Sequence, residues 1–140
     1  MPFRYLPDIA IADIAFEAES GTVNGLFESC GLAVSDVMVD PASLRPSTIR
    51  NVELVSDGVD TLLYDFLTEL IVIKDVDSTL FRDFEVRVSE DGKTLLARLV
   101  GEQIDRERHA LRNDVKAVTM HMFGVRQEEN AWKATIVLDI

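Results

Sequence analysis

The spacing of apolar residues changes several times along the chain, and each change marks a predicted element. Over residues 3–16 apolar positions alternate loosely with small or polar ones, which predicts one or two strands interrupted near Pro7. Over 23–38 they recur with the period of a helix, and the hydroxyls of Ser20 and Thr22 are suited to cap it. This helix should end near residue 40, because Pro41 and Pro46 cannot continue it.

The remaining pattern predicts one further helix and several strands. Together with the first half, it gives two helices and a mostly antiparallel or mixed sheet, which is an α+β fold. A chain of 140 residues is long enough for one hydrophobic core, so a single domain over 1–140 is expected. The predicted elements are a strand at 48–54, a helix from Ser56-Asp57-Gly58 to Ile73, a hairpin of strands at 80–88 and 95–100, a polar segment at 101–114, and strands at 115–123 and 132–138.

The composition indicates a folded protein without a membrane-spanning segment. Hydrophobic residues make up 47% of the chain and charged residues 28%, which supplies the apolar surface that a disordered chain lacks. The longest mostly apolar stretch, 62–73, contains Asp65, Thr68 and Glu69, so no membrane span is expected. The first residues carry no signal-peptide pattern, which points to a cytoplasmic protein. The one cysteine, Cys30, lies on the apolar stripe of the first helix and is expected in the core.

Acidic residues outnumber basic ones, and the excess lies in the first half of the chain. The formal net charge is −11, of which residues 1–75 contribute −9 from 13 acidic and 4 basic side chains. A negative field repels phosphate backbones, so direct and stable binding of DNA or RNA is not expected. A basic protein partner or a metal cation suits this charge better.

The chain lacks the short motifs that indicate autonomous catalysis. It contains no Gly-rich phosphate loop, no HExxH or CxxC motif and no Ser-His-Asp order, so no catalytic residue is assigned. Asp65 and Glu69 share one face of the second helix, but no His or Cys accompanies them, which favours a solvated face. His121, on the long strand, is expected to be a hydrogen-bonded structural residue rather than a ligand.

Two positions near the chain ends are candidates for binding a cation. Asp13 stands among apolar residues in a predicted strand, although a solvated, outward-facing carboxylate is the commoner reason for this pattern. The Asp139 side chain and the terminal carboxylate of Ile140 adjoin at the end of the last strand, and a hard cation such as calcium or magnesium would relieve their repulsion. A frayed, solvated terminus is the alternative.

The only concentration of basic residues lies in the polar segment before the long strand. It comprises Arg106, Arg108, His109, Arg112 and Lys116. It either balances nearby acidic charge or positions a phosphate or an acidic partner surface. The spacing alone leaves both alternatives open.

Several short segments match one known protein family in order, with compatible spacing and up to the last residue. They are Ala12-Asp13-Ile14, Ser35-Asp36-Val37-Met38, residues 62–70, Gly101-Glu102, Glu107-Arg108-His109, and residues 115–121 and 136–140. Across its whole length the chain resembles archease, the small protein that activates RtcB-type tRNA-splicing RNA ligases.

This resemblance implies a fold and a role. The archease fold is α+β, with one small strand-helix-strand (SHS2) module inserted into another. Archease is a non-catalytic cofactor that promotes guanylylation of the ligase's active-site histidine and supports multiple turnover in tRNA splicing or RNA repair. GTP and divalent metal are used at the ligase. By resemblance, the expected partner is therefore an RtcB-type RNA ligase.

The resemblance also assigns site residues. The family's metal site, commonly occupied by calcium, maps onto Asp13, Asp139 and the terminal carboxylate of Ile140, which merges the two candidate positions into one oxygen-rich site. Lys116 matches the family's Val-Lys-Ala-Val-Thr motif and is assigned, with His109, to the surface that contacts the partner or its nucleotide. A divalent metal, with calcium the expected ion, is the implied cofactor.

One departure from the family pattern lies beside this site. Where the family has His-Thr before Ala-Asp, this chain has Ala10-Ile11, which puts the family's metal affinity and ion choice in question. Two other functions are alternatives: a protein-binding adaptor or chaperone of another RNA-modifying enzyme, and, less favoured, a stand-alone metal-dependent hydrolase that uses Asp65 and Glu69.

Overall fold

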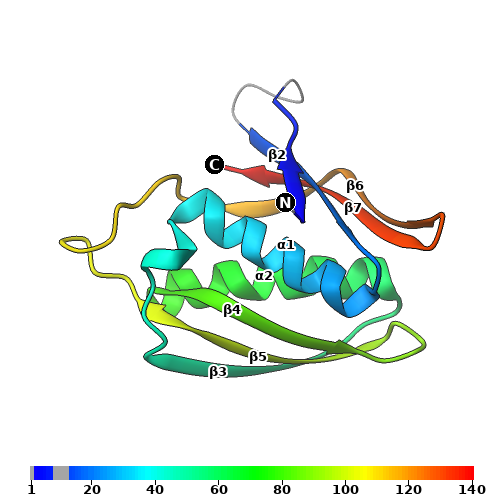
Figure 1. Ribbon diagram of the computed structural model, residues 1–140, viewed down its shortest axis with the longest axis horizontal. Coiled ribbons are helices and arrows are strands. Elements are labelled where there is room, and N and C mark those ends of the chain that lie inside the picture. The colour runs from blue at the N-terminus through cyan, green and yellow to red at the C-terminus, as the bar shows by residue number, and fades with distance from the viewer. Residues whose placement is uncertain (1, 8–12) are drawn as a thin grey trace.

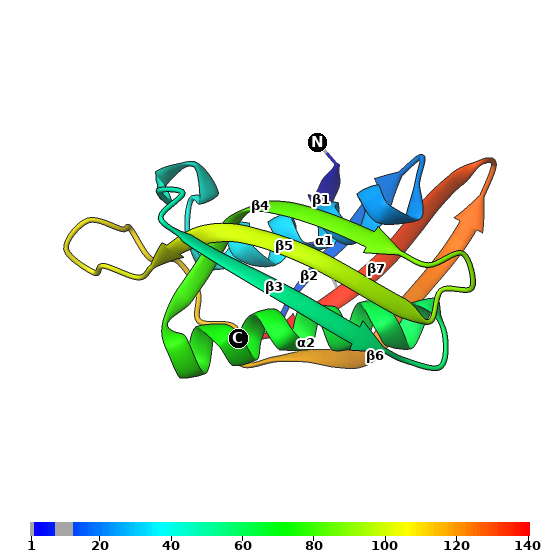
Figure 2. The same cartoon turned by 90° about the horizontal axis from the view of Figure 1, so that it is seen from below.

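Two helices lie between two antiparallel sheets in the computed structural model, which describes residues 2–7 and 13–140 (Figure 1). The four-stranded sheet has the order β1-β2-β7-β6, and the three-stranded sheet has the order β3-β5-β4. Seen from below, the three-stranded sheet lies in front of α1, and α2 runs along the β3 side of this sheet (Figure 2). The strands are β1 (Phe3–Tyr5), β2 (Asp13–Ser20), β3 (Thr48–Val55), β4 (Thr79–Val88), β5 (Thr94–Gln103), β6 (Ala117–Glu128) and β7 (Ala131–Asp139), and the helices are α1 (Val23–Met38) and α2 (Val59–Asp77).

The order of elements shows one module inserted into another. The inserted module runs from β3 through α2 and β4 to β5, and its three strands form the three-stranded sheet. The outer module is divided around it in the sequence: β2 and α1 precede it, and β6 and β7 follow it. The α+β class, the antiparallel pairing and the nested modules are therefore confirmed. The strands divide between two sheets, which the alternation of side chains does not indicate, because alternation identifies the buried face of a strand and not its neighbour.

The helices form where the sequence predicts them. Thr22 caps α1, since its hydroxyl oxygen accepts the N–H of Gly25 at 3.0 Å. Phe27 of α1 and Phe66 of α2 are fully buried, with ring centroids 6.1 Å apart, and Cys30 lies in the same core as expected. Helix α2 continues past the last predicted apolar position to Asp77. Among the described residues, no helix is long and apolar enough to cross a membrane.

Strand β6 departs from the regular alternation expected of it. The pairing of β6 with β7 moves from Thr119 opposite Val137 to Gly124 opposite Thr135, so β6 bulges outward between these two pairs. The bulge leaves the side chains of Met120 and Met122 64% and 50% exposed. The expectation for His121 is wrong, because its ring is exposed and makes no hydrogen bond within the described part of the chain.

Candidate functional site

The start of β2 and the end of β7 lie side by side at one end of the four-stranded sheet (Figure 1). Asp13 is the pairing partner of Asp139, and on the other side of β7 Asp139 is paired with Ala117 of β6. Residues opposite one another in a sheet point to the same face, with Cβ atoms about 5 Å apart. The fold thus brings together two carboxylates from opposite ends of the chain.

Lys116 and the chain terminus complete this end of the sheet. The backbone N–H of Lys116 donates to the carbonyl oxygen of Asp139 at 2.8 Å, and the Lys116 side chain is exposed. Ile140 follows Asp139 directly, and its side chain packs against the core. We call Asp13, Lys116, Asp139 and Ile140 the terminal-strand site.

The donor set of the terminal-strand site fits a hard divalent cation. Asp13 and Asp139 are half-buried and offer carboxylate oxygens from two paired strands. Within residues 2–7 and 13–140, no group of three or more His, Cys, Asp or Glu side chains gathers around one point. The described residues thus bring two carboxylates, Asp13 and Asp139, to this place, and the assignment of Ile140 to a metal site stays a prediction. Oxygen donors of this kind suit calcium or magnesium better than zinc.

A cavity of about 360 Å³ adjoins Asp13 and contains polar residues that sequence reasoning did not assign to the site. Asp36, near the end of α1, accepts the Tyr5 hydroxyl at 2.5 Å and the Arg112 guanidinium at 3.1 Å, and all three line this cavity. Burial and the hydrogen bond to the Asp36 carboxylate raise the pKa of Tyr5, so the phenol remains a donor. Asp36 lies in the segment Ser35-Asp36-Val37-Met38, which matches the family, so the resemblance is the feature of the sequence that could have indicated Asp36.

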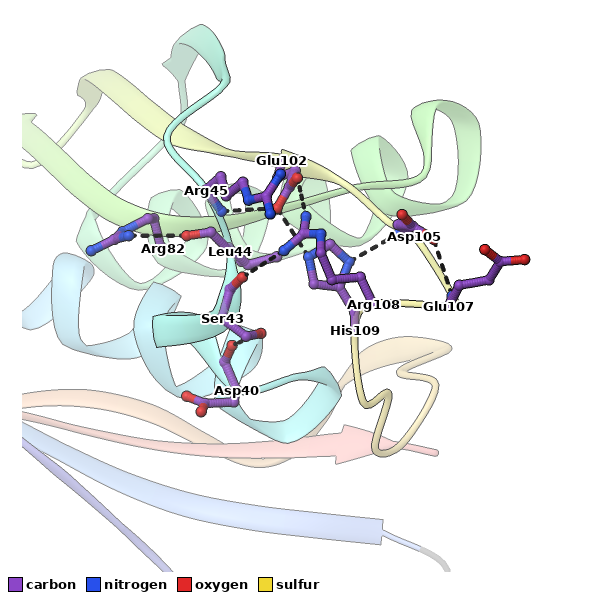
Figure 3. Close-up of polar contacts among 10 residues, drawn as sticks. All are labelled: Asp40, Ser43, Leu44, Arg45, Arg82, Glu102, Asp105, Glu107, Arg108 and His109. Atoms are coloured by element: carbon purple, nitrogen blue, oxygen red, sulfur yellow. Dashed lines mark hydrogen bonds and ion pairs between the residues drawn. The ribbon is translucent and has the colours of Figure 1, made fainter.

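His109 lies beneath the surface, in a polar cluster around Glu102 (Figure 3). Its side chain is fully covered, Nδ1 accepts the N–H of Asp105 at 2.9 Å, and Nε2 lies 3.0 Å from Glu102 Oε1. Because Nδ1 accepts, the ring proton is on Nε2, which donates to the carboxylate. Glu102 also accepts the N–H of Arg45 at 2.8 Å and the guanidinium of Arg108. Because its side chain is buried, His109 can affect a partner only indirectly. It does so by fixing the conformation of loop 104–116, which ends at Lys116.

The basic segment is divided rather than gathered into one patch. Arg108 pairs with Glu102 and Arg112 pairs with Asp36. Among the described residues, the exposed Arg106 and Lys116 make no ion pair. Of the two alternatives for this segment, balance of acidic charge accounts for Arg108 and Arg112, and it does not account for Arg106 and Lys116.

Replacing Glu102 by Gln should destabilise the protein at neutral pH and have less effect in acid. The N–H of Arg45, followed by Arg108 and His109, lowers the pKa of Glu102 from 4.5 to about 2. A carboxylate with a lowered pKa stabilises the fold fully above its ordinary pKa, and this stability is lost as the pH falls through the folded value. Urea denaturation should show the difference between wild type and Glu102→Gln shrinking below pH 4.5 and vanishing near pH 2. A difference that stays constant over this range would contradict the role of the charge.

Comparison with known proteins gives one family. The model of the archease protein family (MTH1598/TM1083) matches residues 3–140. The chain belongs to the archease family. Protein archease of Pyrococcus abyssi is 36% identical over 132 residues, which cover 92% of this chain and 93% of the relative. Protein archease of Methanothermobacter thermautotrophicus is 38% identical over 131 residues, with the same coverage.

Solved structures agree with this membership. The solution structure of protein 1598 of Methanobacterium thermoautotrophicum has a TM-score of 0.84 at 34% identity and covers 99% of both chains. The crystal structure of an archease from Thermotoga maritima, described as a possible chaperone, has a TM-score of 0.69 and covers 96% of both chains. At 14% identity, the second likeness shows the archease fold alone.

The described residues do not include the position at which this chain departs from the archease motif. Ala10 and Ile11, which stand in place of the family's His-Thr, fall within 8–12, outside the described part of the chain. Asp65 of α2 is exposed, as the predicted solvated face requires, and Glu69 is half-buried. Neither carboxylate belongs to the terminal-strand site.

Proposed function

We propose that this protein is a non-catalytic cofactor that activates an RtcB-type RNA ligase, promoting guanylylation of the ligase and its repeated turnover in tRNA splicing or RNA repair. Membership of the archease family supports this role. The observation that carries it is the pairing of Asp13 with Asp139 next to Lys116, because it gathers the charged residues of the family motifs at one exposed strand end.

The proposal divides the chemistry between the two proteins. The ligase provides the nucleophilic histidine, GTP and the RNA ends, and this chain provides carboxylate oxygens and one ammonium group. Asp13, Asp139 and the terminal carboxylate of Ile140 would hold a divalent cation, with calcium the expected ion. A bound cation supplies positive charge that neutralises phosphate oxygens.

Lys116 has a separate part in this division. Its exposed ammonium is a point charge with three donors, which suits the oxygens of a triphosphate. Its backbone N–H donates to the backbone carbonyl of Asp139, so the backbone from which the side chain starts is held next to Asp139. We assign Lys116 to contact the nucleotide or the acidic groups that bind it at the ligase.

The charge of the chain supports a protein partner over RNA. The net charge is −11, and most of the negative excess precedes residue 76. An acidic protein is repelled by phosphate backbones and attracted by a basic protein surface. A channel that holds RNA in a ligase is basic by the same reasoning, so this chain is suited to dock beside it.

Replacing Lys116 by Met should slow guanylylation of the ligase at least about tenfold. The reason is loss of the ammonium group that is proposed to contact the nucleotide or its acidic ligands, while the methionine keeps the length of the side chain. Labelled GTP incorporated into the ligase, with a divalent metal and without RNA, measures this step directly. Lys133→Met is the matched control, because Lys133 pairs with Glu128 far along β7 and should leave the rate unchanged.

The adaptor or chaperone alternative predicts a different outcome. A chain that only docks would tolerate Lys116→Met, provided that binding persists. Equal guanylylation with the wild type, Lys116→Met and Lys133→Met would therefore refute the proposed part of Lys116 and favour docking alone.

A further inference from the structure

The inserted module carries a buried lysine near the segment that leads to the terminal-strand site. Lys74 lies in the last turn of α2 and is only 9% exposed. Its ammonium lies 2.5 Å from a carboxylate oxygen of Asp114, 2.8 Å from one of Asp75, and 2.7 Å from the carbonyl oxygen of Val115. An ammonium group has three N–H donors, so each of them has an acceptor.

The contact with Val115 leads directly to the site. The Val115 carbonyl and the Lys116 N–H belong to one peptide group, which is planar and moves as a unit. The carbonyl accepts from Lys74, and the N–H donates to Asp139 at 2.8 Å. Both polar groups of this peptide are thus held, from α2 on one side and from β7 on the other. The peptide orientation, and with it the place from which the Lys116 side chain starts, is fixed.

The ammonium of Lys74 stays charged in this position. Burial by itself lowers the pKa of Lys74, but hydrogen bonds to Asp114 and Asp75 outweigh burial and raise the pKa overall. Hydrogen bonds from a charged donor are stronger than neutral ones. The bond to the Val115 carbonyl is therefore a strong anchor at neutral pH.

Other contacts hold the same loop at positions that precede Val115 in the sequence. The Glu102–His109 contact lies near the middle of loop 104–116, the Asp36–Arg112 pair follows it, and the backbone N–H groups of Arg112 and Asn113 donate to the carbonyl oxygens of Met38 and Val37. Lys74 is the last anchor before the site and the one that acts on the site peptide itself. It also comes from the inserted module, whereas Asp139 belongs to the outer one.

We infer that Lys74 is a positioning residue for Lys116, through which the inserted module sets the geometry of the terminal-strand site. This inference rests on the proposed function for its effect on the ligase. Its structural part, the coupling of Lys74 to the Val115–Lys116 peptide, is measurable without the ligase.

The test replaces Lys74 by Met, which fills similar space and removes the donors. Amide hydrogen exchange at Lys116 should become at least about tenfold faster, because its peptide group loses one of its two hydrogen bonds. In ligation assays the maximal rate should fall several-fold, while the protein concentration for half-maximal activation stays the same, since the docking surface is intact. Arg50→Met is the matched control: Arg50 pairs with Asp77 at 2.5 Å at the same end of α2 but contacts neither Val115 nor Lys116.

A second variant guards against loss of folding. Asp114→Asn changes a side chain that is 73% exposed, leaves the Val115 bond in place, and should raise exchange at Lys116 by less than Lys74→Met does. Exchange at Lys116 that is unchanged in both variants, or changed equally in Arg50→Met, would overturn the inference. Faster exchange with full activation would overturn the functional part. If the wild type itself fails to activate the ligase, the proposed function fails, whereas the exchange result still decides the coupling.

Discussion

The Asp13→Asn variant should lose activation of the ligase by about two orders of magnitude while keeping the fold. The amide has the shape of the carboxylate, so the pairing of β2 with β7 is preserved, but the negative charge that a divalent cation requires is gone. Loss of one electrostatic group at a reacting centre typically costs about 100- to 1,000-fold in rate. The measurement is the number of ligations per ligase at saturating concentrations of the variant, together with calcium binding by calorimetry.

Two further variants make this result specific. Asp139→Asn should reproduce the loss, because Asp139 faces the same side of the sheet as Asp13. Asp65→Asn removes an equivalent charge from the exposed face of α2 and should activate like the wild type. Thermal unfolding checks that all three variants fold. Full activation by Asp13→Asn would show that activation does not depend on the terminal-strand site.

The Gly101→Ala variant should be destabilised by about 3 kcal/mol or more, or fail to fold. Gly101 lies in β5, the central strand of the three-stranded sheet, opposite Thr48 and Phe81. A Cβ atom there would lie 1.9 Å from the carbonyl oxygen of Leu80 and 2.7 Å from the Cα atom of Phe81. Both are backbone atoms, so the clash is relieved only by moving β4 away from β5. Urea denaturation measures the free energy of unfolding.

Gly124→Ala is the control for this prediction. Gly124 also lies in a strand, but a Cβ atom added there meets nothing within 4 Å. Its free energy of unfolding should stay within about 0.5 kcal/mol of the wild type. Equal stability of the Gly101 and Gly124 variants would show that β4 and β5 separate at little cost, contrary to their close backbone packing.

The elements of this fold are readable from the sequence because each depends on local spacing. The apolar period over 23–38 defines α1, and the proline residues after it explain where it ends. The bulge in β6 is not readable in this way, since Met120 and Met122 continue an apolar alternation and yet are exposed. Alternation records where apolar residues stand and does not record where a strand gains extra residues relative to its partner.

The candidate site required more than local spacing. Asp13 and Asp139 are 126 positions apart, and only the register of β2 against β7 places them together. From the sequence, the family resemblance supplied this connection. Lys74 gave a weak signal, a charged residue that continues the apolar run of α2, and its contact with Val115 spans 41 positions. His109 shows the opposite problem, because a polar residue in a basic segment suggests the surface and the structure buries it.

The most direct test of the central claim is to count ligations per ligase. The RtcB-type ligase of the same organism would be supplied with GTP, divalent metal and a cleaved tRNA, with and without this protein. The proposed function predicts many turnovers per ligase with the protein and about one or fewer without it. The same number of turnovers in both reactions would contradict the activator role. It would indicate that this archease acts on a different partner.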